Sequence, residues 1–337
     1  MRVVNIHGPG DVRLDPSPDR PMGPGDVLLR VGACGVCGSD LTFIRNGGAG
    51  PLVASDEPMP LGHEASGTVL AVGPDVEGIA PGERVVLNPM MSESVIGNGG
   101  PEGAFTEKLL VRNAVPGKTL LKIPEGMDFE LAALTEPLAV ALHSVNRGKV
   151  RAGDRAVVFG AGPIGLGITY WLARRGARDI VVADLSPYRL DQARAFGATA
   201  VIRADQDDIK ARLHALHGRI DSPFGALSGT DVYFDAAGAP QVIPSVVELA
   251  KPDARLVVTA VYSRPIPLDL TTFLTREMHV TSAIGYPVEF GEVIAELRES
   301  PEDLRRMISH RFSFNEVLSA FQIAGTPESA KVMVAFS

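Results

Sequence analysis

The stretch Gly-Ala-Gly-Pro-Ile-Gly at positions 160–165 restricts the possible folds of this chain more than any other part of the sequence. It follows the apolar run 155–159 and opens a helical pattern, so a strand should turn directly into a helix here. Gly160 permits a tight turn, Gly162 lets the backbone approach a pyrophosphate, and Gly165 allows the helix to pack closely on the strand. The motif therefore predicts a dinucleotide site at the start of a helix.

The sequence around this motif alternates between short apolar runs and longer helical patterns, as is typical of a parallel sheet covered by helices. Six runs are predicted as strands, the number of a complete dinucleotide-binding fold: Arg155–Gly160, Asp179–Asp184, Thr199–Ile202, Asp231–Asp235, Leu256–Val261 and His279–Ile284. Helices are predicted between them, including Ile164–Arg175, Pro187–Phe196 and Val242–Ala250.

Asp184 ends the second predicted strand, about 20 residues after the last glycine of the motif, where an acid binds the ribose hydroxyls of a dinucleotide. A 2′-phosphate about 4 Å from this carboxylate would be repelled by on the order of a few kcal/mol, so we expect NAD rather than NADP. The alternative interpretation is a glycine turn followed by an N-cap aspartate, without a ligand. Further cofactor contacts are expected at Pro163, Ile164, Arg189, Ala236, Val261 and Lys331.

The first 122 or so residues contain short β-rich runs separated by glycine and proline, which predict a compact all-β unit. After Tyr286 come two helical patterns, at 290–297 and 316–323, and a last apolar strand at 332–336. This tail is too short for a domain, so we expect it to pack on the N-terminal unit. The glycine-rich segment 96–103 is expected to be an exposed loop.

Net charge and apolar content exclude several classes of partner. The 337 residues include 32 Lys and Arg against 40 Asp and Glu, a formal charge of −8, which argues against nucleic acid. No run of about 18 apolar residues occurs, and the N-terminus lacks an apolar signal segment. The sequence thus predicts a cytoplasmic protein that does not bind membranes.

Four side chains could bind a metal: Cys37 in Cys-Gly-Ser-Asp, His63 and Glu64 in Leu-Gly-His-Glu, and Glu136 in Thr-Glu-Pro-Leu-Ala-Val. Thiolate, imidazole and carboxylate are all zinc ligands, and a catalytic zinc takes three protein groups while one position stays open. Each residue taken alone has an ordinary alternative, namely a buried free cysteine, a core histidine or an acid at a helix start. Composition alone does not decide between these interpretations.

The ordered motifs resemble those of the zinc-containing medium-chain alcohol dehydrogenases. Gly62-His63-Glu64 with Gly67 and Gly73 matches the metal signature of that family, and the Cys-Gly-Ser-Asp, Glu-Pro-Leu-Ala-Val and Gly-Ala-Gly-Pro-Ile-Gly runs occur in the family's order. Glu136 in place of a second cysteine is similar to the polyol, butanediol and threonine dehydrogenase branch. The resemblance implies an α/β fold: a GroES-like β-rich catalytic domain (1–137), a Rossmann domain with a six-stranded parallel sheet (138–287) and a C-terminal segment that returns to the catalytic domain (288–337).

The resemblance also implies roles for individual residues. Cys37, His63 and Glu64 would bind the zinc, and Glu136 would bind it directly or through water. Asp40 would accept the second N–H of His63 and fix its tautomer. Ser39 would pass the proton of the alcohol outward.

Three further positions bear on the site. Family members often have a histidine where this chain has Thr42, so the outer half of the proton relay is open to water or to Thr42 itself. Phe43 and Tyr286 are expected to contact substrate. Sorbitol-type members tend to have Phe-Arg-Tyr where this chain has Ile284-Gly285-Tyr286, so a grip on distal hydroxyls is missing and small or apolar substrates are favoured.

Cysteine usage limits the metal content. Segment 88–103, where relatives usually have a lobe of four cysteines, contains none, so one catalytic zinc per chain and no structural zinc is expected. Cys34 would form a C-x-x-C pair with Cys37, but a redox pair would remove the thiolate that zinc needs. We therefore interpret Cys34 as a core residue.

These observations predict an NAD-dependent zinc alcohol dehydrogenase that converts a secondary alcohol or vicinal diol to a ketone. A zinc-free quinone reductase of the same superfamily is the first alternative, and a non-catalytic dinucleotide-binding protein is the second. The resemblance further implies a homodimer or homotetramer, because sheet edges near residues 261–284 commonly pair between subunits in these enzymes.

Overall fold

The computed structural model describes residues 1–17, 20–49, 57–223, 225–262 and 264–336. The chain divides into two units, which are described separately. Unit 1 comprises Met1–Glu136 and Phe290–Ser337, and unit 2 comprises Pro137–Glu289. No helix in the described part of the chain is both long and apolar enough to cross a membrane.

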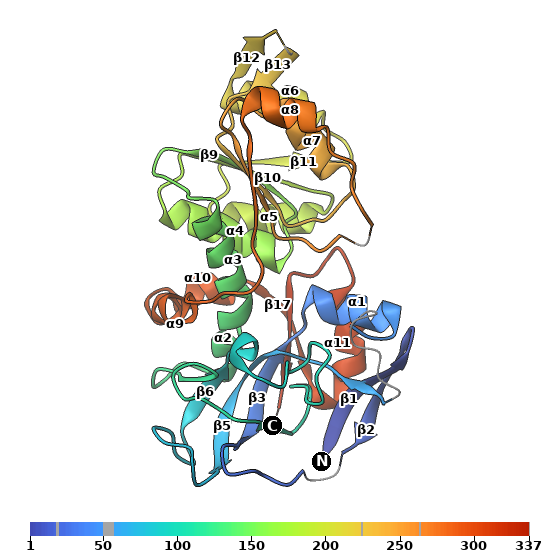
Figure 1. The fold of residues 1–337 in the computed structure, drawn as a ribbon, viewed down its shortest axis with the longest axis vertical. Coiled ribbons are helices and arrows are strands. Elements are labelled where there is room, and N and C mark those ends of the chain that lie inside the picture. Colours follow the sequence, from blue (N-terminus) through green and yellow to red (C-terminus); the bar gives the residue numbers. More distant parts are fainter. Residues whose placement is uncertain (18–19, 50–56, 224, 263, 337) are drawn as a thin grey trace. The chain divides into compact units, whose positions relative to one another are not determined.

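Unit 2 is built on the predicted six-stranded parallel sheet, in the order β11-β10-β9-β14-β15-β16 (Figure 1). The order reverses between β9 and β14, which makes the carboxyl ends of these two strands the place where an open α/β sheet binds its ligand. The strands are β9 (Arg155–Phe159), β10 (Asp179–Asp184), β11 (Ala200–Arg203), β14 (Val232–Asp235), β15 (Arg255–Val258) and β16 (His279–Ser282).

Helices cover both faces of this sheet, and Figure 1 shows α4 and α5 on one side and α7 and α8 on the other. Several begin as local sequence rules predict: proline occupies the first position of α4, and the Ser186 Oγ accepts the N–H of Arg189 at the start of α5. The helices of unit 2 are α4 (Pro163–Arg174), α5 (Pro187–Ala195), α6 (Ile209–His217), α7 (Val242–Leu249), α8 (Leu270–Arg276) and most of α3 (Thr135–Arg147).

Two features of unit 2 differ from the sequence prediction. The hairpin β12 (Arg219–Ser222) and β13 (Gly225–Ser228) was not predicted, because its strands are short and largely exposed. The strand predicted to reach Val261 ends at Val258, because the amides of Thr259 and Ala260 both donate to the Asp235 carbonyl and the parallel ladder stops there. Val261 consequently lies in an exposed turn.

Unit 1 consists mainly of strands, in a seven-stranded sheet and a three-stranded sheet β2-β1-β4. The C-terminal strand β18 pairs with β3, which places the end of the chain beside the N-terminal strands. The strands are β1 (Arg2–Gly8), β2 (Asp11–Pro16), β3 (Val27–Gly35), β4 (Met59–Pro60), β5 (Glu64–Val72), β6 (Arg84–Leu87), β7 (Lys108–Val111), β8 (Leu120–Lys122), β17 (Ile308–Ser313) and β18 (Lys331–Ala335). The helices are α1 (Gly38–Asn46), α2 (Phe129–Ala133), α9 (Phe290–Glu299), α10 (Pro301–Arg305) and α11 (Val317–Ala324).

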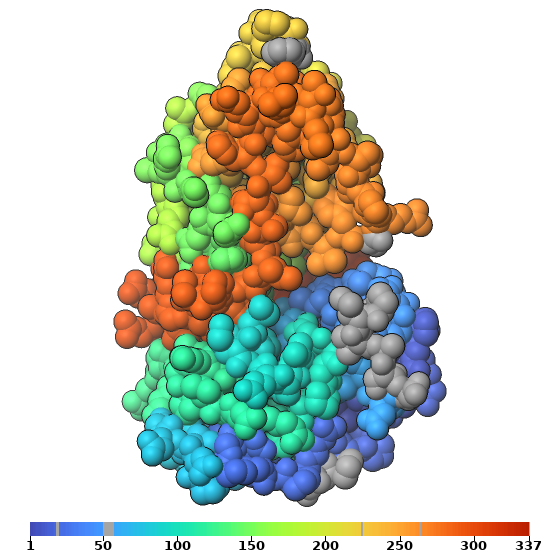
Figure 2. Space-filling view, viewed as in Figure 1, coloured from blue at the N-terminus to red at the C-terminus, as the bar shows by residue number. Residues whose placement is uncertain are grey.

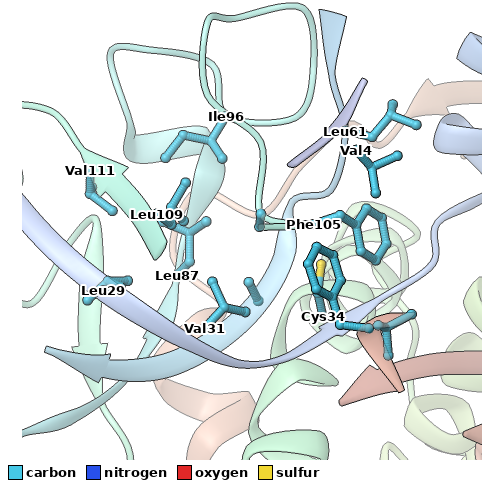
Figure 3. Close-up of a cluster of buried hydrophobic side chains, with 14 of the residues drawn as sticks. Val4, Leu29, Val31, Cys34, Leu61, Leu87, Ile96, Phe105, Leu109 and Val111 are labelled. Carbon is cyan, nitrogen blue, oxygen red and sulfur yellow. The ribbon is translucent and has the colours of Figure 1, made fainter. Parts of the chain in front are cut away.

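The core of unit 1 lies between these strands and α11. Phe105 and Phe321 meet edge to face with ring centroids 5.1 Å apart, and Figure 3 shows Cys34 beside Phe105. Cys34 has no exposed surface and belongs to this cluster, which confirms the prediction that it is a core residue. Burial raises the pKa of its thiol well above the usual range.

Segment 96–103 is a loop, as predicted, but the prediction that it is exposed was wrong. Ile96 and Glu102 are buried, and two glycines lie against the backbone just before His63. A Cβ on Gly97 would lie 2.0 Å from the Gly62 carbonyl oxygen, and one on Gly103 would lie 2.4 Å from the Leu61 carbonyl oxygen. The glycines therefore serve close packing against the segment that presents His63.

Candidate active site

Cys37 lies at the junction between β3 and α1. It is the N-cap of α1, in an extended conformation with φ −94° and ψ 153°, and its backbone N–H donates to Asp40 Oδ2 at 2.9 Å. The thiol is thus carried at the positive end of a helix, where negative charge is stabilised.

His63 directly precedes β5 and Glu64 begins it, and β5 pairs with β3, the strand that leads to Cys37. Gly62 has a φ of +96°, and its carbonyl accepts the Ala104 N–H at 2.8 Å, so the chain turns sharply before β5 begins at Glu64. The structure brings together one ligand atom each from Cys37, His63 and Glu64, all within 4.8 Å of one another. Residues far apart in sequence therefore form one donor set of sulfur, nitrogen and oxygen.

Asp40 lies beside both Cys37 and His63. Its side chain is completely buried, with Oδ2 on the Cys37 amide and Oδ1 3.7 Å from His63 Nδ1. Neither Asp40 Oδ1 nor His63 Nδ1 has a hydrogen-bond partner among the described residues, so a small approach would pair them. Such a bond leaves the other ring nitrogen of His63 for a metal.

The electrostatics of the cluster suit a cation. Burial opposes a charged imidazole, but the neighbouring Cys37, Asp40 and Glu136 outweigh it and raise the pKa of His63 well above its ordinary value. Burial also raises the pKa of Asp40 to about 6. A half-buried cysteine with a buried histidine and a buried carboxylate, next to the further acids Asp40 and Glu136, matches the ligands that zinc takes in proteins, so the residues present fit a zinc ion.

Glu64 also forms a buried ion pair. The Lys331 ammonium is within 2.6 Å of each carboxylate oxygen of Glu64 and donates to the Val36 carbonyl at 2.9 Å. Lys331, predicted as a cofactor contact, is thus directed at Glu64 and has almost no exposed surface. Glu136, in the first turn of α3, is buried and acts electrostatically on both His63 and Lys331, but it is not one of the three residues that share the 4.8 Å cluster.

The polar side chains of α1 differ in their hydrogen bonding. Ser39 Oγ is buried and has no hydrogen-bond partner in the described part of the structure. Thr42 Oγ1 donates to the Gly38 carbonyl at 3.1 Å and accepts from Arg45 Nη2 at 3.0 Å. Phe43 packs half-buried against the core of unit 1. In unit 2, Tyr286 is buried.

The glycine motif lies at the carboxyl end of β9. Two of its positions require glycine, one for its backbone conformation and one for lack of space. Gly160 has a φ of +93°, and a Cβ on Gly165 would lie 1.8 Å from the Gly160 carbonyl oxygen. At Gly162, the N-cap of α4, a Cβ would meet no heavy atom within 4 Å. Asp184 accepts the Ala161 N–H at 2.7 Å and the Ser186 N–H at 2.8 Å, so it joins the motif to the end of β10.

Asp235 and Tyr262 were not predicted from the sequence. Asp235 Oδ1 accepts the N–H groups of Ala237 and Gly238 at 3.0 Å each, and Oδ2 accepts the Tyr262 hydroxyl. The buried carboxylate thus connects the segments that follow β14 and β15. It also holds Ala236 close to Gly160, so that a Cβ added to Gly160 would lie 2.9 Å from the Ala236 carbonyl carbon. The available signal was an acid at the carboxyl end of the predicted strand Asp231–Asp235.

Comparisons with known proteins agree with this arrangement. Residues 23–125 match the alcohol dehydrogenase GroES-like domain, and residues 163–299 match the zinc-binding dehydrogenase domain. A sorbitol dehydrogenase from Rattus norvegicus is 31% identical over 98% of this chain and 94% of its own length. An (R,R)-butanediol dehydrogenase from Bacillus subtilis is 30% identical over 94% of both chains. The structure of an alcohol dehydrogenase from Escherichia coli complexed with NADH covers 100% of this chain and 99% of its own, with 27% identity and a TM-score of 0.86.

Proposed function

This chain belongs to the zinc-dependent medium-chain alcohol dehydrogenases, and on that premise we propose that it oxidises a secondary alcohol or vicinal diol to a ketone with NAD. The observation that carries the proposal is the clustered donor set of Cys37, His63 and Glu64, whose ligand atoms lie within 4.8 Å of one another. A zinc-free reductase or a non-catalytic dinucleotide-binding protein has no use for such a set. Zinc content measured together with NAD reduction separates the three functions.

Cys37, His63 and Glu64 would hold one zinc ion. Because Lys331 contacts both oxygens of Glu64, we assign a further carboxylate ligand to Glu136, bound directly or through water. When bound, zinc supplies a Lewis acid that lowers the pKa of an alcohol hydroxyl. No second, structural zinc is proposed, because segment 88–103 contains no cysteine.

The chain's own residues then orient the ligands and manage the proton. Asp40 accepts the backbone N–H of Cys37, and a small approach of its Oδ1 to His63 Nδ1 would fix the ring of His63. Ser39, whose hydroxyl is buried without a partner among the described residues, would accept the proton of the alcohol at Oγ while it releases its own hydroxyl proton outward. Thr42 already donates its hydroxyl proton to the backbone of α1, so we assign the next step outward to water.

The substrate class is tested with a panel of alcohols. Gly285 offers no side chain to distal hydroxyls, and each hydroxyl left unpaired in a buried site costs about 1 to 3 kcal/mol. We expect kcat/KM for butane-2,3-diol, measured by NADH formation, to exceed that for sorbitol or xylitol at least about tenfold. Residues 50–56, which the sequence leaves open as a source of polar groups, lie outside the described residues. A tenfold preference for a polyol or sugar acid would show that the site is polar.

Cofactor choice provides a second prediction. Asp184 is fixed by two backbone N–H groups at the edge where the dinucleotide ribose would bind. Repulsion of a 2′-phosphate should favour NAD over NADP by about tenfold for every 1.4 kcal/mol. Initial rates with the two cofactors measure this preference, and equal efficiency with NADP would show that Asp184 does not contact the ribose.

We further propose that unit 2 forms a homodimer or a pair within a homotetramer. Strand β16 is an edge of the sheet, and Leu270 and Leu274 of the neighbouring α8 are 72% and 77% exposed. Figure 2 shows the segment around α8, in orange, on the surface of unit 2. A free strand edge with exposed apolar side chains is typical of a pairing surface.

Replacing Leu274 with aspartate should therefore shift the protein toward monomer, because a charge would be buried in the interface. Light scattering coupled to gel filtration measures the mass. Leu318 on α11 of unit 1 is 39% exposed, and Leu318→Asp is the matched control that should leave the mass unchanged. An unaltered mass for Leu274→Asp would place the interface elsewhere.

A further inference from the structure

Arg203 lies next to Asp184 at the edge of the sheet. It is the last residue of β11 and the register partner of Asp184 in the parallel pairing of β10 with β11. The Ala204 N–H donates to the Asp184 carbonyl at 3.0 Å, so the chain continues along the same edge. The negative charge of Asp184 is among the influences that raise the pKa of Arg203. A guanidinium therefore stands within electrostatic reach of the acid assigned to the ribose.

Two aspartates that follow β11 hold this arginine. Nε and Nη2 of Arg203 donate to the two carboxylate oxygens of Asp205 at 3.0 and 2.9 Å, a bidentate pair. The backbone N–H of Arg203 donates to Asp207 Oδ2 at 2.8 Å. The turn thus fixes the arginine from its backbone and from its side chain, and it directs the guanidinium at Asp205.

Because its guanidinium is paired with Asp205, Arg203 is unavailable to bind a phosphate on the ribose. The planar fork of a guanidinium matches a phosphate as well as a carboxylate, and an arginine near the ribose accommodates the 2′-phosphate of NADP. Because the Arg203–Asp205 pair is substantially exposed, it contributes little to stability. The main consequence of the pair is that it neutralises one positive charge in a region that contains three carboxylates, those of Asp184, Asp205 and Asp207.

We propose that Asp205 is a specificity-determining residue, which holds Arg203 in a bidentate pair and so prevents it from binding a 2′-phosphate. This inference rests on the proposed dinucleotide site at Asp184. It adds that removal of Asp184 alone is insufficient for NADP use, because Arg203 stays paired with Asp205. Two effects would then favour NAD over NADP. Asp184 repels the 2′-phosphate, and Asp205 keeps Arg203 from attracting it.

The experiment compares binding of ADP-ribose and 2′-phospho-ADP-ribose to the zinc-loaded protein by calorimetry. Asp184→Asn should weaken ADP-ribose binding. Adding Asp205→Asn should tighten 2′-phospho-ADP-ribose at least about tenfold relative to Asp184→Asn, as expected for new charge-assisted hydrogen bonds, and should change ADP-ribose binding less than twofold. Adding Arg203→Gln to this double variant should abolish the gain, and kcat/KM for NADP should follow the same order.

A matched control is available in unit 2. Arg219 Nε donates to Asp221 Oδ1 at 2.8 Å, another pair two residues apart, in β12. Asp221→Asn in the Asp184→Asn background should leave both affinities unchanged. A gain that is absent, or that survives Arg203→Gln, overturns the role of Asp205. If Asp184→Asn leaves ADP-ribose and NAD binding unchanged, the proposed cofactor site itself is wrong, and the inference fails with it.

Discussion

Replacing Cys37 with alanine should release the bound zinc and reduce turnover by roughly 10³-fold or more. The thiolate is the one sulfur in the donor set, and Lewis-acid stabilisation by a metal is worth several kcal/mol, with about 1.4 kcal/mol for each factor of ten in rate. Metal analysis and NAD reduction by the same preparation measure the two losses together. The substitution is at an N-cap whose cap bond comes from the backbone N–H, so α1 keeps its bond to Asp40.

Cys34 provides the matched control, since it is the other cysteine and lies three residues away in the core. Cys34→Ala should keep its zinc and its turnover, while a small cavity lowers the free energy of unfolding by about 1 kcal/mol. Full activity of Cys37→Ala after chelation would remove Cys37 from the ligand set. Two zinc ions per chain in the unaltered protein would contradict the single-site proposal.

The sequence predicts those parts of the fold that depend on local chemistry. The six strands of the parallel sheet are confirmed, because buried parallel strands appear as apolar runs between helical patterns. The glycine turn also follows local rules, since Gly160 needs a positive φ and Gly165 has no room for a Cβ. The zinc-dependent alcohol dehydrogenase family was identified from ordered motifs, and the domain matches and relatives confirm it.

Long-range pairing is what the sequence left undetermined. Lys331 was predicted as a cofactor contact, but its buried ion pair with Glu64 was not predicted. The return of the C-terminal segment was expected, whereas no local pattern gives the register in which β18 pairs with β3. The segment 96–103 was expected to be exposed because glycine-rich stretches usually are, but its glycines allow close contact with the backbone before His63.

The exact end of a strand was also difficult to predict from the sequence. The run 256–261 is apolar apart from Thr259, itself a β-branched residue, so sequence pattern alone extends the strand to Val261. The hydrogen bonds end it earlier, because one carbonyl of Asp235 takes two successive amides. The same acid, through its side chain, joins two turns beside the glycine motif. Its role depends on neighbours that only the folded sheet brings together.

Replacing Ser39 with alanine should lower kcat by about 10² to 10⁴, the range of general acid–base catalysis. The buried Oγ has no hydrogen-bond partner among the described residues, so its loss breaks no bond of the fold, and alanine suits an α-helix at least as well. We therefore expect an unchanged melting temperature. NAD affinity should also be unchanged, because the hydroxyl acts on the proton of the alcohol rather than on the dinucleotide.

Thr42→Val is the matched control for this prediction, since it removes the other hydroxyl of α1. That hydroxyl donates to the Gly38 carbonyl one turn earlier, where solvent or the backbone of the helix can replace it. Turnover of Thr42→Val should therefore change only a few-fold, and stability slightly. Steady-state rates with NADH titrations for both variants separate catalysis from cofactor binding. A Ser39→Ala variant that loses NAD affinity but keeps its turnover would place this hydroxyl at the cofactor and assign the alcohol proton to another group.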